Sequence, residues 1–220
     1  MIITATYIVA GFLLNGCSQA VSETQPVSGK TTEAKIFSDT ELTPGEYVQW
    51  FKSAENPLRK SETVNELRYI LEYRPAELTA LQQLQKESVT KAELDSAMKD
   101  MEGLVQFRME IDVPGSGKEF LKHNLKNDTD YEPRVQYFAF EMQKDICALT
   151  EKGDTIPCAM YHFERSYGVS PVSVFLLGFS ELEINGKLEV IVNEKIFANK
   201  TIRFVFDAAE IKNIPQLKTL

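Results

Sequence analysis

Two side chains that could exchange a proton stand at positions 162 and 164, in a run that alternates like a β-strand. His162 and Glu164 are separated by one residue, so in a strand both point to the same face, about 7 Å apart. An imidazole and a carboxylate are the types used in general acid–base catalysis. A solvated structural pair has the same spacing, so the pattern leaves both roles open. We assign no catalytic residue and keep a hydrolase that uses His162 and Glu164 as the alternative function.

Two cysteines flank a second pattern that could do chemistry. Cys147 and Cys158 stand on either side of Lys152-Gly153, which are typical turn residues. If these two residues form the centre of a hairpin turn, Cys147 lies opposite Cys158. Directly opposed residues of an antiparallel pair are close enough for a disulfide, which would contribute about 3 kcal/mol. We therefore predict a disulfide between Cys147 and Cys158, with two separate buried thiols as the alternative.

Other catalytic and metal-binding patterns are missing from the sequence. The only two histidines, His123 and His162, lack the spacing of a zinc motif. The run Pro-Gly-Ser-Gly-Lys at 114–118 lacks the first Gly of a phosphate-binding loop and the Ser or Thr after its Lys. The sequence therefore predicts no metal site and no cofactor, and it favours a protein that is not an enzyme. The ligand-binding residues stay unknown at this stage.

The beginning of the chain is apolar and uncharged over residues 2–14 and ends in Leu14-Asn15-Gly16-Cys17. Thirteen helical residues span about 20 Å, less than the hydrocarbon core of a membrane, but this length suits the apolar region of an export signal. A buried N-terminal element followed by a chance Gly-Cys is the alternative.

These four residues resemble the lipobox of bacterial lipoproteins. Leu14 matches the aliphatic position, Gly16 the small position, and Cys17 the residue that is lipidated and becomes the new N-terminus. Asn15 departs from the pattern, and the first basic residue is Lys30, so a start upstream would be needed to supply the basic region. The resemblance implies a signal peptide over residues 1–16 and a membrane anchor of fatty acyl chains, palmitate among them, on Cys17.

The charge of the chain limits its partners. The formal net charge is −8, and residues 1–16 contribute none of it. Nucleic acids and anionic lipid headgroups both require clustered Lys and Arg, so neither is an expected partner. Attachment to the membrane would come from the lipid on Cys17.

Composition divides the chain into three parts. Residues 17–42 are rich in Ser, Thr, Gln, Pro and Gly, which predicts a flexible tether after the signal peptide. Residues 43–220 hold enough apolar side chains for a single globular domain.

The pattern within this domain predicts an α+β fold, with two or three helices in the N-terminal half and a mostly antiparallel β-sheet or sandwich in the C-terminal half. Helices are expected after Thr43-Pro44, after Pro75 and after the capping pattern Thr90 to Glu93. The clearest strand is 105–113, and Asn185-Gly186 predicts a hairpin. Further strands are expected at 67–73, 135–142, 145–150, 156–164, 172–179, 187–192 and 201–206.

The layout also resembles envelope lipoproteins of Bacteroidetes-type bacteria, through runs such as Tyr73-Arg74-Pro75-Ala76-Glu77 and His162-Phe163-Glu164-Arg165. The resemblance implies no particular activity. We expect an exported cell-envelope lipoprotein that faces the periplasm or the cell surface. Its most plausible role is a binding or structural module for another envelope protein or a ligand.

Overall fold

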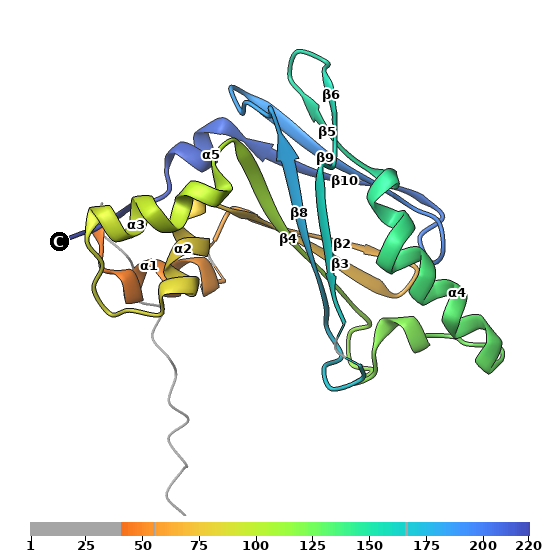
Figure 1. Cartoon of the computed structure of the whole chain (residues 1–220). Coiled ribbons are helices and arrows are strands. Elements are labelled where there is room, and N and C mark those ends of the chain that lie inside the picture. The colour runs from red at the N-terminus through yellow and green to blue at the C-terminus, as the bar shows by residue number, and fades with distance from the viewer. Residues whose placement is uncertain (1–40, 55, 166) are drawn as a thin grey trace, which may run out of the picture. The chain divides into compact units, whose positions relative to one another are not determined.

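The computed structural model of this chain describes residues 41–54, 56–165 and 167–220. Within them, helices and antiparallel sheets are both present, and the C-terminal half is mostly sheet (Figure 1). The predicted α+β class is therefore confirmed. The predicted signal peptide, Cys17 and almost all of the predicted tether lie outside the described residues.

The first sheet has five antiparallel strands in the order β2-β3-β4-β8-β7. The sequence expectation for 105–113 is confirmed by β4, which is the central strand and pairs with β3 and β8. Its alternate residues Phe107, Met109 and Ile111 are buried, so this face of the sheet forms one wall of the core. The strands run over β2 (Arg59–Val64), β3 (Leu67–Arg74), β4 (Leu104–Asp112), β8 (Ser173–Ser180) and β7 (Met160–Glu164).

The second sheet has four antiparallel strands in the order β10-β9-β5-β6. They are β10 (Lys200–Asp207), β9 (Lys187–Glu194), β5 (Ile146–Thr150) and β6 (Thr155–Pro157). The strand expected over 156–164 is wrong as a single element, because the chain changes sheets in its middle. The N–H of Cys158 donates to Ile146 O (3.2 Å) in the second sheet, and the N–H of Ala159 donates to Gly178 O (2.8 Å) in the first. Pro157, which has no N–H, ends β6 just before this crossing.

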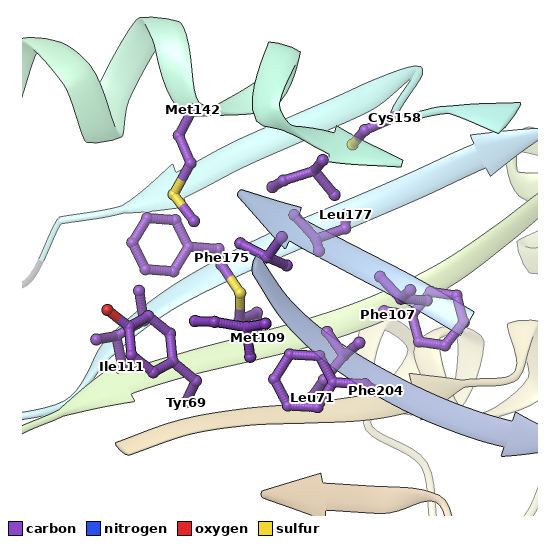
Figure 2. Close-up of a cluster of buried hydrophobic side chains, with 14 of the residues drawn as sticks. Tyr69, Leu71, Phe107, Met109, Ile111, Met142, Cys158, Phe175, Leu177 and Phe204 are labelled. Carbon is purple, nitrogen blue, oxygen red and sulfur yellow. The ribbon is translucent and has the colours of Figure 1, made fainter. Parts of the chain in front are cut away.

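The main core lies between the two sheets (Figure 2). The ring of Phe107 on β4 packs against Phe179 on β8 and Phe206 on β10, with centroid distances of 5.8 and 5.2 Å. Aromatic contacts of this kind join the sheets directly, since β10 belongs to the second sheet.

The three predicted helices are confirmed as α1 (Pro44–Lys52), α2 (Ala76–Leu84) and α3 (Lys91–Met98). They pack in two further apolar clusters: α1 and α2 form the helical cluster, and α2 and α3 form a smaller one. Thr43 and Thr90 cap α1 and α3 as expected. Tyr73 of β3 packs against both the helical cluster and the main core. The helices are therefore part of the same packed unit as the sheets.

The two ends of the described chain pair with each other. β1 (Glu41–Leu42) lies parallel to β11 (Gln216–Leu217), and Leu42 is 2% exposed. The predicted start of the domain at residue 43 is thus too late, because residues 41 and 42 already belong to the fold.

The strand expected at 135–142 is wrong, since this segment is helical. It runs through α4 (Tyr131–Gln136), the π-helical η4 (Tyr137–Glu141) and the 3-10 turn η5 (Met142–Asp145). A strand would place Phe138 and Phe140 on one face, but Phe138 is fully buried and Phe140 is 70% exposed. The burial of Val135, Phe138 and Met142 follows helical spacing. The neighbouring aromatic residues made this helical pattern look like a strand in the sequence.

The hairpin predicted at Asn185-Gly186 is also wrong. These residues lie in the connection from β8 to β9, and β8 and β9 belong to different sheets. Glu181 ends β8 with a left-handed backbone (φ 59°), and Leu182 is buried in the core. The segment 181–186 is therefore a crossing between sheets. The remaining short elements are η1 (Lys99–Met101), η2 (Phe120–Lys122), η3 (Asp128–Asp130) and α5 (Ala208–Lys212).

Candidate functional site

The face of the five-stranded sheet that points away from the core carries rows of charged side chains. In one row, the strand register places Arg59, Glu72, Arg108, Leu176 and His162 side by side on β2, β3, β4, β8 and β7. Neighbouring side chains in such a row are close enough to interact. The row therefore brings together charges from distant parts of the sequence.

Hydrogen bonds link these charges into a chain. Arg59 donates to Glu72 through Nη1 (3.1 Å) and to Glu110 through Nη2 (2.8 Å). Arg74 also donates to Glu72 (3.1 Å), and Arg108 donates to Glu110. Two carboxylates thus hold three guanidinium groups in fixed positions.

A groove of about 720 Å³ lies over this network. We call it the charged groove. Residues of α1 and α2 form its opposite wall, including Val48, Phe51, Leu78 and Gln82. The exposure of the side chains in this network ranges from 34% for Arg59 to 6% for Glu72.

Burial changes the proton affinity of Arg108 at the base of the charged groove. Desolvation lowers the pKa of its guanidinium below the ordinary value, and the positive charges of Arg74 and Arg59 lower it further. The carboxylates of Glu72 and Glu164 act in the opposite direction. The loss of hydration at Arg108 therefore outweighs the attraction of these carboxylates, and the net shift of its pKa is downward.

The arrangement is suited to recognition by hydrogen bonds and charge. A guanidinium group has five N–H donors in a planar fork that matches carboxylate and phosphate groups. Among the described residues, the hydrogen bond to Glu110 is the one that Arg108 makes. Within the described parts of the chain its other N–H donors have no hydrogen-bond acceptor, so they are available to a molecule in the groove.

The structure places the predicted acid–base residues at the edge of this site. His162 and Glu164 share the exposed face of β7, as the sequence predicted, and Glu164 lines the charged groove. His162 is not among the lining residues of the groove, and the described contacts include no hydrogen bond between the two side chains.

The register predicted around Cys147 and Cys158 is wrong by one residue. Cys147 pairs with Pro157, because the N–H of Thr150 donates to Asp154 O (2.9 Å), which leaves residues 151–153 as the turn, with Gly153 in a left-handed conformation (φ 90°). A shift of one residue sends the two side chains to opposite faces. Both cysteines are free thiols in the structure, and the Sγ of Cys158 lies 3.0 Å from Met160 O.

Another buried charge has a structural role. Glu194 is 1% exposed, and its carboxylate accepts hydrogen bonds from the N–H groups of Phe197 (2.9 Å) and Ala198 (2.5 Å) and from the Tyr69 hydroxyl (3.1 Å). These bonds fix the β9–β10 loop, so Glu194 is satisfied by the protein itself.

The sequence analysis missed the arginines and glutamates of the charged groove. The sequence feature that could have indicated this groove is the set of polar residues in the alternating strands, which includes Arg108 and Glu110 on β4 and Glu72 on β3. In the sequence these residues cannot be distinguished from ordinary solvent-facing residues of a strand. Only the strand register and the positions of α1 and α2 show that they line a groove.

Comparisons with known proteins identify no relative of known activity. No family model matches the chain, and no curated protein matches it. A crystal structure of a protein of unknown function from Burkholderia pseudomallei K96243 aligns over 74% of this chain and 89% of its own, at 12% identity and a TM-score of 0.35. None of the helices in the described residues is long and apolar enough to span a membrane.

Proposed function

We propose that this protein is a cell-envelope lipoprotein that acts as a binding module, with the charged groove as its ligand site. The observation that carries the proposal is the position of Arg108, whose guanidinium lies at the base of the groove with donors left over for a ligand. The Arg59 and Arg74 side chains beside it are already held by Glu72.

Stability alone is a poor explanation for this network. Partly buried ion pairs lose much of their hydration, and apolar residues of similar size stabilise a protein as well or better. A ligand with an anionic group would recover the desolvation of Arg108, and Glu164 would accept hydrogen bonds from its polar groups. We therefore expect a polar ligand that carries a carboxylate or phosphate.

Native mass spectrometry of the protein purified from its own envelope tests this site. We expect a non-covalent adduct on the wild type that Arg108→Met loses. Arg203→Met is the matched control, because Arg203 also pairs with a glutamate but lies on β10 in the other sheet. An absence of any adduct together with no shift in melting temperature on addition of envelope small-molecule extract would refute the proposal, as would equal retention by both variants.

Membrane anchoring is tested separately. Replacing Cys17 by Ser should release the exported protein from the membrane fraction, because no acyl chain can then be attached. A Cys17→Ser protein that still floats with membranes would show that the lipoprotein assignment is wrong.

The alternative hydrolase is tested at His162, which lies outside the lining of the charged groove. A binding module should retain its adduct in His162→Ala. A hydrolase that depends on His162 would instead lose turnover of its substrate in this variant.

A further inference from the structure

A second hollow adjoins the charged groove at Arg74 and Gln106 and has a different character. It has a volume of about 920 Å³ and lies between the start of α2, the segment α3–η1, the start of β4 and residues 181–183 after β8. We call it the acidic groove. Of the network in the charged groove, only Arg74 lines it, and Arg59, Arg108 and Glu110 do not.

The floor of the acidic groove is apolar. Met98, Met101, Leu104 and Leu182 line it together with Tyr73. Met101 and Leu182 are nearly buried, whereas Met98 and Leu104 are partly exposed. Flexible thioether and leucine side chains of this kind adapt to an apolar partner.

The rim of the groove is negatively charged. Five acidic side chains line it against two basic ones: Glu77, Asp95, Glu102, Glu181 and Glu183 against Arg74 and Lys99. The charge of Arg74 is already engaged by Glu72 (3.1 Å).

Within the described part of the chain, no ion pair joins Glu77, Glu102 or Glu181 to a basic side chain. An uncompensated negative rim around an apolar floor is complementary to a positively charged, apolar surface. The described residues contain no group of three or more acidic, His or Cys side chains placed to hold a metal ion. The carboxylates come from the start of α2, from α3, from the residue after η1 and from residues 181–183, so they are spread along the rim, as a ligand with several separated positive charges requires.

We propose that the acidic groove docks a cationic amphipathic segment of a partner protein. Apolar side chains of the segment lie on Met98, Leu104 and Leu182, and its Lys or Arg side chains pair with Glu77, Glu102 and Glu181. The two grooves share only Arg74 and Gln106 in their linings, so the anchored protein would hold a ligand and a protein partner at adjoining places.

The test uses the mature protein and a short labelled synthetic peptide in which Leu and Lys alternate, followed by fluorescence anisotropy. The double variant Glu102→Gln/Glu181→Gln should bind this peptide about tenfold more weakly, because each exposed ion pair contributes a few-fold in affinity. The matched control is Glu62→Gln/Glu132→Gln, which removes the same charge from exposed positions that do not line the groove. We expect the control to bind as the wild type does, and added salt to weaken the wild type more than the groove variant.

Three results would overturn the proposal. Equal weakening in the groove and control variants would show general attraction between opposite charges. Equal binding of a peptide with Ser in place of Leu would show that the apolar floor is not used. A dimer in sedimentation that dissociates in Glu102→Gln/Glu181→Gln would show that a second copy of this chain occupies the groove.

Discussion

At the scale of the residue, burial decides the chemistry of the two thiols. Cys158 lies in the main core (Figure 2), and burial raises its pKa from 9.0 to about 11. Burial also raises the pKa of Cys147, while Arg203 opposes this shift. Since the thiolate is the reactive form, both thiols are poor nucleophiles at neutral pH.

We predict that iodoacetamide at pH 8 modifies Cys147 slowly and Cys158 only after unfolding. The rates follow from the partial exposure of Cys147 and the buried position of Cys158. Peptide mapping by mass spectrometry measures both sites, and unfolding in urea is the control for complete reaction. A linked Cys147–Cys158 peptide in a non-reduced digest would contradict this prediction and restore the disulfide that the sequence suggested.

The raised pKa also predicts how stability depends on pH. Because the folded state binds the Cys158 proton more tightly, this contribution is fully present below pH 9 and is lost as the pH rises through about 11. Between these values, the free energy of unfolding should fall more steeply in the wild type than in Cys158→Ala, measured by urea unfolding. If the free energy of unfolding falls with pH equally in the two proteins, the raised pKa of Cys158 is wrong.

At the scale of the element, the sequence predicted those helices and strands whose formation depends on neighbouring residues. The capping pattern at Thr90 starts the expected helix, and the alternation in 105–113 forms the expected strand. Both patterns depend only on residues that are close together in the sequence. The segment 135–142 was misread, because aromatic residues suit both strands and buried helix faces.

The charged groove could not be predicted in the same way. Glu72 and Arg108 are far apart in the sequence and meet only through the register of β3 with β4. That register depends on the packing of the opposite face, which no local pattern encodes.

The β5–β6 loop offers a prediction at this scale. Gly153 has φ 90°, so Gly153→Ala should lower the free energy of unfolding by about 1–2 kcal/mol, measured in urea. Gly45→Ala is the control, because Gly45 lies in α1 with an ordinary φ and free space around it. There the change should be neutral or stabilising. Equal losses in both variants would argue against the left-handed loop.

At the scale of the whole molecule, the two sheets and the helices share side chains. Phe107 joins the sheets, and the edge of its ring meets Tyr73, which packs against the helical cluster as well. Contacts shared in this way make separate unfolding of one part costly.

We predict that the described unit unfolds in a single transition. Trp50, the only tryptophan, lies in α1 and reports on the helical cluster through its fluorescence, while far-ultraviolet circular dichroism reports on all helices and strands. The two curves in urea should coincide in the wild type. Phe107→Ala should shift both midpoints together, with a loss of about 3–5 kcal/mol. A shift confined to one probe would show two independent parts.

The pairing of β1 with β11 has a consequence for the order of the chain itself. Glu41 lies beside Gln216, and the N–H of Lys218 donates to Leu42 O (2.8 Å), so the first described residues lie beside residues 216–218, close to the other end. The chain from 41 to 220 thus nearly forms a closed ring, so its fold should depend little on where in the ring the two termini are placed. A circular permutant that joins residue 220 to residue 41 by a short Gly/Ser linker, and begins at Ser116 in the exposed loop after β4, should keep the circular dichroism spectrum of the parent. The same permutation opened between Arg108 and Met109, inside the central strand, should not fold.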